Sequence, residues 1–429
     1  MKEAYSITAR ELAALGKEHV PPELQSGEHL IYSSPAALAF NSPGAQGFGV
    51  KRAGLAIPGS VMLLVAPGCC GRNTAALSAP EYRDRFFYLL MDETDIVTGR
   101  HLGKIPEAVQ EVCRACREKP TVVMLCITCV DALLGTDMER VCRRASEAAG
   151  VPVLPCYMYA LTREGRLPPM TAVRKSVYSL LEPRAKRPDA ANILGFFSPL
   201  TDDCELYALL RAAGIRQIRE ISRCRDFEEY RSMAEANFNL VLNPEARYAA
   251  AELETRLSIP SVELSRVCQL DKIANQYRLL GQILSTQLPD EPFRLQAEQA
   301  QARFQIRHPD TVFSLGETSN ANPFELAIAL LRTGFRVAEL FATVSDANFP
   351  YIRRLAALSP ETKIYSNLSP SMLFYDGGKN SVTVTIGSDA AYYHPEAAHL
   401  LWNEEAQPFG YRGVRLLYEQ LEKTLEEKT

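Results

Sequence analysis

Two uninterrupted apolar runs of strand length stand out in the first third of the chain. Residues 61–66 and 121–127 have the sequences VMLLVA and TVVMLCI, and each run gives way to cysteine and small residues. Continuous apolar runs of this length, bounded by turn signals and followed by helical patterns, are typical of strands buried inside a parallel sheet. We therefore expect both runs to be parallel strands connected by helices.

The alternation of strand and helix patterns continues to the C-terminus. Apolar runs at 192–197 and 238–242 alternate with helical patterns, and the same order recurs from residue 311 onward. Such alternation predicts parallel sheets with right-handed crossovers. We predict an α/β fold with three Rossmann-like domains, whose parallel sheets are flanked by helices, over residues 1–185, 186–290 and 291–429.

Two segments interrupt this pattern. Residues 160–190 carry several prolines and basic side chains, which is typical of a linker on the surface. Residues 42–54 are rich in glycine, which lets backbone approach a neighbouring chain or a bound group closely.

Composition narrows the class of protein. A chain of 429 residues is too long for one core, so several domains are expected. The net charge of −4 gives no reason to expect nucleic acid or an anionic membrane as a partner. No apolar run approaches the ~20 residues that span a bilayer, and the N-terminus lacks a signal-peptide core. We expect a cytoplasmic protein.

The eleven cysteines are the main candidates for chemistry. Their number is odd, and a chain of this size does not need disulfide bonds. Cys69 and Cys70 follow the first apolar run, and Cys129 follows the second. The carboxyl ends of parallel strands meet at one edge, where ligands of α/β proteins bind, so these three thiols are expected at one rim. Thiolates select iron–sulfur clusters, zinc or Cu(I).

Two alternatives remain for the cysteines. Cys113, Cys116, Cys126 and Cys129 form two CxxC pairs with the spacing of a zinc site. However, the first pair lies in a helical pattern and Cys126 lies inside an apolar strand, whereas zinc ribbons need tight polar turns. The other alternative is that the rim cysteines are buried structural thiols.

Other common site motifs are weak or missing. No GxxxxGK[ST] and no GxGxxG after a strand occur, so no ATP site is expected in this chain. The loop GETSNAN at 316–322 is a possible anion cradle before a helix. His394 and His399 lack a ligand-like spacing, and a structural role is favoured for both.

Several segments resemble the nitrogenase component 1 superfamily. The turn APGCCG resembles the family's HGPxGCG turn, and TCVDALLGTDMERV resembles its TCxxxxIGDD segment. The resemblance places Cys70 and Cys129 on cluster-ligating cysteines of the family, and Gly135 and Asp137 on its GDD turn. Three further segments also resemble the family, namely NSPGAQG, ETDIVTGRHLGKIPEAVQEV and WNEEAQPFGYRG.

The chain departs from this family at its cofactor ligands. Asn41 or Ser42 stands where the family's first cluster cysteine is expected. Asn243 replaces the cysteine that ligates the large metal cofactor of nitrogenase α subunits, and Leu400 replaces the cofactor histidine. Neither side chain offers a thiolate or an imidazole, so the resemblance implies that this is not a catalytic nitrogenase α subunit.

The resemblance implies an iron–sulfur cluster, a [4Fe-4S] centre, held in part by Cys70 and Cys129, with Cys69 as third ligand. The cluster is expected to receive electrons from an ATP-hydrolysing iron protein and to pass them to a reducible substrate or metallocofactor. The alternatives are a non-catalytic scaffold or carrier for metallocofactor assembly, and a cluster-free binding protein. Because a cubane cluster needs about four ligands, a subunit interface is expected to complete it, in a homodimer or in a heterodimer with a related component 1 subunit.

Overall fold

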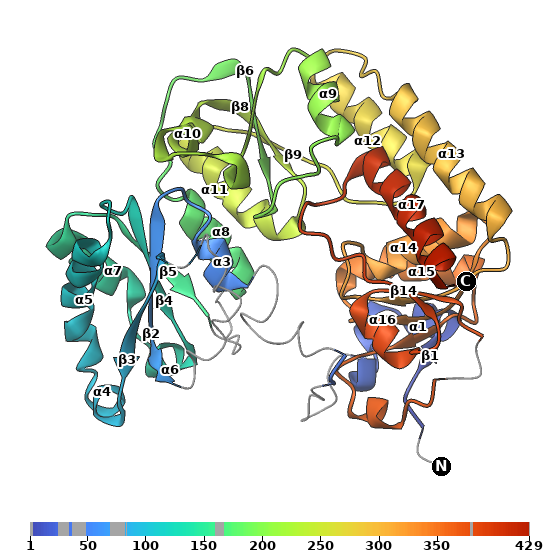
Figure 1. Cartoon of the computed structure of the whole chain (residues 1–429), viewed down its shortest axis with the longest axis horizontal. Coiled ribbons are helices and arrows are strands. Elements are labelled where there is room, and N and C mark those ends of the chain that lie inside the picture. Colours follow the sequence, from blue (N-terminus) through green and yellow to red (C-terminus); the bar gives the residue numbers. More distant parts are fainter. Residues whose placement is uncertain are drawn as a thin grey trace. The chain divides into compact units, whose positions relative to one another are not determined.

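The protein is described by a computed structural model of the chain (Figure 1). The structure describes residues 3–24, 34–36, 49–68, 82, 84–158, 167–377 and 381–428. The chain divides into two compact units. The cysteine unit comprises Ser42–Pro199 and Ile215–Ser265, and the C-terminal unit comprises Met1–Asn41, Leu200–Gly214 and Arg266–Thr429.

The first sheet of the cysteine unit has the order β3-β2-β4-β5 in the described part of the chain, and all its strands are parallel. Its strands are β2 (Ser60–Pro67), β3 (Phe86–Met91), β4 (Val122–Ile127) and β5 (Val153–Tyr157). The chain runs from β2 to β3 on one side and then to β4 on the other side of β2. The strand order therefore reverses between β2 and β4, and the crevice at their carboxyl ends is the topological switch point of this sheet.

Helices cover both faces of this sheet, as Figure 1 shows. Helices α5 (His101–Ala115) and α7 (Met138–Ala149) pack on each other and on one face, where β2 contributes Val61, Leu63 and Val65 to the core. The alternate residues Met62 and Leu64 belong to a second core on the opposite face, as the two-residue period of a strand requires. Helices α3 (Val50–Gly54) and α8 (Pro169–Tyr178) close that opposite face.

The second sheet of the cysteine unit has the order β7-β6-β8-β9 among the described residues and is also parallel. A buried hydrogen bond of 2.9 Å joins Asn192 of β6 to Asn239 of β8. Helices α8 and α11 pack together, and the same apolar core continues from the first sheet to this one. The elements are β6 (Arg187–Leu194), β7 (Gln217–Glu220), α10 (Phe227–Arg231), β8 (Ala236–Val241), α11 (Arg247–Leu257) and β9 (Ser261–Glu263).

The C-terminal unit is built on a sheet with the order β1-β12-β11-β10-β13-β14 over its described residues. Its strands are parallel except for β1, which pairs antiparallel with β12. The strands are β1 (Ile7–Thr8), β10 (Val312–Gly316), β11 (Arg336–Phe341), β12 (Lys363–Tyr365), β13 (Val384–Ile386) and β14 (Ala398–Leu400). The helices are α1 (Ala9–Leu15), α9 (Glu205–Ala212), α12 (Leu270–Ile283), α13 (Glu291–Arg307), α14 (Pro323–Arg332), α15 (Phe349–Leu358), α16 (Ser388–Tyr393) and α17 (Gly410–Lys428).

The predicted α/β class, with parallel sheets flanked by helices, is confirmed. Each of the three predicted ranges holds the main strands of one sheet, although β1 joins the sheet at the other end of the chain. The domain boundaries at 185 and 290 stay a prediction. No helix in the described part of the chain is both long enough and apolar enough to cross a membrane.

The prediction of a surface linker over 160–190 was wrong for residues 169–178, whereas residues 182–188 are mostly exposed, as a surface linker requires. Helix α8 forms the first of these ranges, and the basic residue Arg174 that suggested a surface position is 4% exposed. Its guanidinium donates to the carbonyl oxygen of Gly195 at 2.7 Å and pairs with Glu245 at 2.8 Å. A buried arginine is tolerated when its donors are satisfied in this way. Strands β3, β7 and β14 were also missed, because they are short or half-exposed.

Candidate functional site

Of the three cysteines predicted at the rim, the structure describes Cys129, which lies beyond β4 at the switch point between β2 and β4. The register pairs Val65 with Ile127, so the two strands end side by side. Cys129 follows β4 and is the first residue of the short helix α6 (Cys129–Leu134). Cys69 and Cys70 lie outside the described residues, but they directly follow Gly68, the last described residue after β2. The chain therefore leads toward Cys69 and Cys70 from the edge of the sheet where Cys129 lies.

Thr128 is the residue that connects β4 to Cys129. Its side chain is 1% exposed, and its hydroxyl oxygen Oγ1 has no hydrogen-bond partner among the described residues. A buried hydroxyl without a partner costs about 1–3 kcal/mol. A group bound at the rim that accepts a hydrogen bond, as the sulfurs of an iron–sulfur cluster do, would remove this cost. This unsatisfied hydroxyl and the half-buried thiol of Cys129 fit such a cluster.

A buried pair of side chains holds α6 against α5. His101 Nε2 lies 2.9 Å from Asp131 Oδ1, and both side chains are 1% exposed. The other ring nitrogen, Nδ1, lies 3.1 Å from the carbonyl oxygen of Asp95 and must donate to it. Because Nδ1 carries a proton, Nε2 can meet the carboxyl group of Asp131 only if a further proton lies between them. The pair therefore has no net charge, which is why it can be buried.

Asp95 completes the connection from α4 (Glu93–Thr98) to α5. Its carboxylate accepts hydrogen bonds from Lys104 Nζ at 2.8 Å and from Arg100 Nε at 3.0 Å. The hydrogen bond from Lys104 is the main cause that holds the pKa of Asp95 down to about 2. Through Asp95, His101 and Asp131, the loops that follow β3 and β4 are fixed relative to each other. These residues position the backbone around Cys129.

The alternative zinc site is not supported. Cys113 lies within α5 and Cys116 caps it, and burial raises the pKa of both thiols. Cys126 is fully buried in β4 opposite Cys156 of β5. Across the described part of the chain, no three histidine, cysteine or acidic side chains gather in a metal-binding group. Cys113, Cys116 and Cys126 therefore pack in or against the apolar core, whereas Cys129 is half-buried at the start of α6. Cys69 and Cys70 lie outside the described residues and are not covered by this test.

The predicted anion cradle at residues 316–322 is occupied by the protein's own carboxylate. The backbone N–H groups of Glu317 and Thr318 donate to Asp389 at 2.9 and 3.4 Å. The next helix, α14, is capped by Asn322, whose side chain accepts from the N–H groups of Phe324 and Glu325. The backbone donors that would hold an external anion are already satisfied, so the prediction of an anion site here was wrong.

The two positions that lack family cofactor ligands have structural roles. Asn243 Oδ1 accepts from the N–H of Glu245 at 3.0 Å and begins a short 3-10 helix, while Leu400 lies buried in β14. The two histidines also have structural partners, as expected. His394 contacts Glu339 and Tyr375, and His399 bonds to Thr385.

His101, Thr128 and Asp131 were not identified from the sequence. The signal for Asp131 and Thr128 was their nearness to Cys129 in the chain. His101 carries no such signal, because its contact with Asp131 spans 30 residues.

Comparison with known proteins identifies the family to which this α/β chain belongs. Residues 45–426 match the sequence model of the family described as nitrogenase component 1 type oxidoreductase. The chain belongs to this family. Solved structures titled nitrogenase Cp1 at pH 6.5 and at pH 5 share the fold, with TM-scores of 0.68 and 0.65. They are 16% and 15% identical to this chain, covering 88% and 95% of it and 91% of each of those chains.

Curated relatives include several proteins named nitrogenase iron-molybdenum cofactor biosynthesis protein NifE. The protein of that name from Nostoc sp. is 27% identical over 236 residues, which is 51% of this chain and 48% of that protein. The one from Rhizobium meliloti is 32% identical over 163 residues, which is 36% of this chain and 34% of that protein. The chain spans about half the length, or less, of these relatives.

Proposed function

We propose that this protein is a scaffold subunit for metallocofactor assembly in a nitrogenase-like system and that it holds an iron–sulfur cluster at the cysteine rim. The observation that carries the proposal is the switch point between β2 and β4, from which Cys129 and the segment bearing Cys69 and Cys70 emerge. The relatives named for cofactor biosynthesis favour a scaffold role. Asn243 and Leu400 favour it too, because neither can anchor a catalytic cofactor to this chain.

At the rim, the thiolates of Cys70 and Cys129, with Cys69 as third ligand, would hold the iron of a [4Fe-4S] cluster. When bound, the cluster supplies one-electron chemistry. The hydroxyl of Thr128 is buried beside Cys129 without a described partner, and it can donate a hydrogen bond toward a cluster sulfur. The neutral pair of His101 and Asp131 holds α6 in place without adding net charge beneath the site. The chain itself thus binds, orients and shields the group.

The cluster would be completed across a subunit interface, in a homodimer or with a related component 1 subunit. An iron protein that hydrolyses ATP is the proposed electron donor. Exposed apolar side chains near the rim support a protein partner there: Val97 of α4 is 84% exposed, and Leu133 and Leu134 of α6 are 57% and 49% exposed. Both helices border the pair of His101 and Asp131. Exposed apolar side chains that lie together are typical of interaction surfaces, and Leu133 and Leu134 are neighbours in the chain.

A second candidate function is electron relay to a reducible substrate, as in an oxidoreductase subunit. The family description favours it. Turnover of a reducible substrate in the presence of an iron protein would distinguish it from a scaffold, because a scaffold releases its metal group to an acceptor protein and does not turn over.

The cluster is tested by measuring iron and acid-labile sulfide in anaerobically purified protein. The Cys129→Ala variant is expected to lose most of the iron and the broad visible absorption. Cys113→Ala is the matched control, because Cys113 packs in the core away from the rim, and it is expected to keep both. Equal iron content in the two variants would contradict the assignment.

The shared cluster is tested by light scattering on the anaerobic protein with and without iron. A dimer that dissociates when the iron is removed is the expected result. A monomer that retains the full iron content would exclude a cluster shared between subunits.

A further inference from the structure

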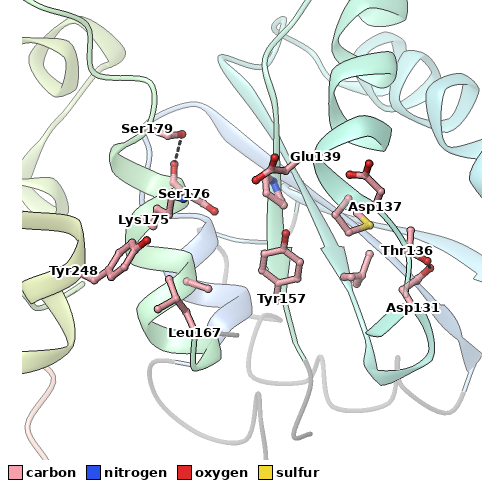
Figure 2. A pocket seen from close by; sticks show the side chains of 14 residues that line it. Asp131, Thr136, Asp137, Glu139, Tyr157, Leu167, Lys175, Ser176, Ser179 and Tyr248 are labelled. Atoms are coloured by element: carbon pink, nitrogen blue, oxygen red, sulfur yellow. Dashed lines mark hydrogen bonds between the residues drawn. The ribbon is translucent and has the colours of Figure 1, made fainter. Parts of the chain in front are cut away.

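A cavity of about 550 Å³, lined by both apolar and polar side chains, lies within the cysteine unit, beside the carboxyl ends of β4 and β5 and not at the switch point (Figure 2). Tyr157, the last residue of β5, stands in its middle. Helix α8 and Tyr248 of α11 form one wall. The segment from Asp131 to Glu139, which joins α6 to α7, forms the other. A volume of this size is typical of a site for a small molecule.

The two walls carry opposite charges. Asp137 and Glu139 lie on the wall formed by the start of α7, and Lys175 lies on the wall formed by α8. No described residue forms an ion pair with Lys175, whose described contact is with the ring of Tyr248 at 5.9 Å from the centroid. The two acidic side chains likewise have no ion-pair partner in the described ranges. The charges therefore face each other across the cavity without neutralising each other.

The carboxyl group of Asp131 adds a buried acceptor to the acidic wall. Its Oδ1 meets His101 and accepts from Thr136 Oγ1 at 3.0 Å, whereas its Oδ2 is buried and accepts no hydrogen bond from the described residues. Asp131 is 1% exposed and lines the cavity. A buried acceptor without a donor is costly, so a donor that enters the cavity and reaches Oδ2 would be bound favourably.

The acidic side chains do not form a cation site. Asp131, Asp137 and Glu139 do not gather into a metal-binding group in the described structure. A metal ion also leaves the ammonium group of Lys175 without a partner. The ligand must instead carry a hydrogen-bond donor, preferably cationic, at one end and an anionic acceptor at the other.

We propose that this cavity binds a small zwitterion, namely an amino acid or a short peptide with free ends. Its ammonium group faces the wall of Asp131, Asp137 and Glu139, and its carboxylate faces Lys175. Tyr157 and Tyr248 provide the surface against which its apolar part packs. This inference goes beyond the proposed scaffold function and does not depend on the presence of a cluster.

Isothermal titration calorimetry on the full chain tests the proposal with a panel of L-amino acids and unblocked dipeptides at millimolar concentration. At least one zwitterion is expected to bind, and the two arms of the panel distinguish an amino acid from a peptide. Its C-terminal amide and its N-acetyl derivative are each expected to bind about tenfold more weakly or worse, because each loses one charge-assisted hydrogen bond. This comparison uses the native protein alone and so does not depend on the folding of any variant.

The variant Lys175→Met locates the carboxylate. It is expected to bind the zwitterion about tenfold more weakly and to bind the C-terminal amide no worse than the native chain does, with unchanged iron content. Lys272→Met is the matched control, because Lys272 is also half-buried and contacts a tyrosine ring, that of Tyr351, in the C-terminal unit. The proposal is overturned if no zwitterion of the panel binds, if the blocked derivatives bind as well as the parent, or if the control weakens binding equally.

Discussion

Replacing His101 with phenylalanine is expected to destabilise the cysteine unit by about 3–5 kcal/mol, because it leaves the Asp131 carboxyl group buried without its partner. Both side chains are 1% exposed and their contact distance is 2.9 Å, so the pair is almost entirely removed from solvent. Thr136 still donates to Oδ1, but one neutral hydroxyl does not compensate a buried carboxylate. In the double variant His101→Phe, Asp131→Leu the uncompensated group is absent, and the loss should be smaller than for His101→Phe alone.

Hydrogen exchange measured by mass spectrometry on peptides covering β4 and α6 provides the assay. A loss of about 3–5 kcal/mol corresponds to exchange that is faster by roughly a hundredfold to a thousandfold or more, as long as it proceeds through unfolding of this unit. Trp402 is the only tryptophan of the chain and is 3% exposed in the C-terminal unit, so its emission reports whether that unit stays folded. His399→Phe is the control, because His399 is exposed and bonds to Thr385 in the C-terminal unit. Exchange in His101→Phe that matches the native chain, or a double variant that loses the sum of both single losses, would refute the buried pair.

Three further predictions concern the surroundings of the rim and the backbone. Asp95→Asn should destabilise the protein at neutral pH, and its difference in unfolding free energy from the native chain should shrink as pH falls from about 4 to about 2. The reason is that the stability from a lowered carboxyl pKa is lost as pH falls through the folded value. Equal differences at pH 4 and pH 2, measured by urea denaturation, would contradict this. Thr128→Val should leave the stability of the protein equal or higher, since it removes an unsatisfied hydroxyl. Because it also removes the proposed hydrogen bond to a cluster sulfur, it should shift the cluster reduction potential to a more negative value in a redox titration. An unchanged potential would exclude that hydrogen bond. Gly195→Ala should lower the free energy of unfolding by about 1–3 kcal/mol or more, because Gly195 has φ +130° and a Cβ would lie 2.6 Å from the backbone nitrogen of Asn243. In Gly103→Ala the added methyl group in α5 meets open space, so the free energy of unfolding should rise by about 0.5–1 kcal/mol.

The sequence by itself determined the class of fold, and it predicted a rim of cysteines. The buried strands β2 and β4 are nearly continuous apolar runs, and their period and length leave little choice of structure. Cys69 and Cys70 follow β2 and Cys129 follows β4 within a few residues, so local patterns were enough to make the prediction of a shared edge. The structure describes the position of Cys129 among these three. The same patterns failed where burial depends on distant partners. Helix α8 looked like a linker because its basic residue Arg174 pairs with groups that the sequence pattern did not reveal.

Only the tertiary structure decided which polar residues meet. The order of strands in the sheet places the switch point between β2 and β4, and no local pattern specifies that order. His101 and Asp131 form a pair because α5 lies after β3 and α6 lies after β4, and these strands flank β2 in one sheet. Strand β1 pairs with β12, which lies near the opposite end of the chain. The walls of the cavity likewise combine the start of α7 with α8 and Tyr248, which are separated in the sequence. Hydrophobic periodicity encodes which face of an element is buried, whereas the pairing of charges and of strand edges depends on the packing of elements that are remote in the chain.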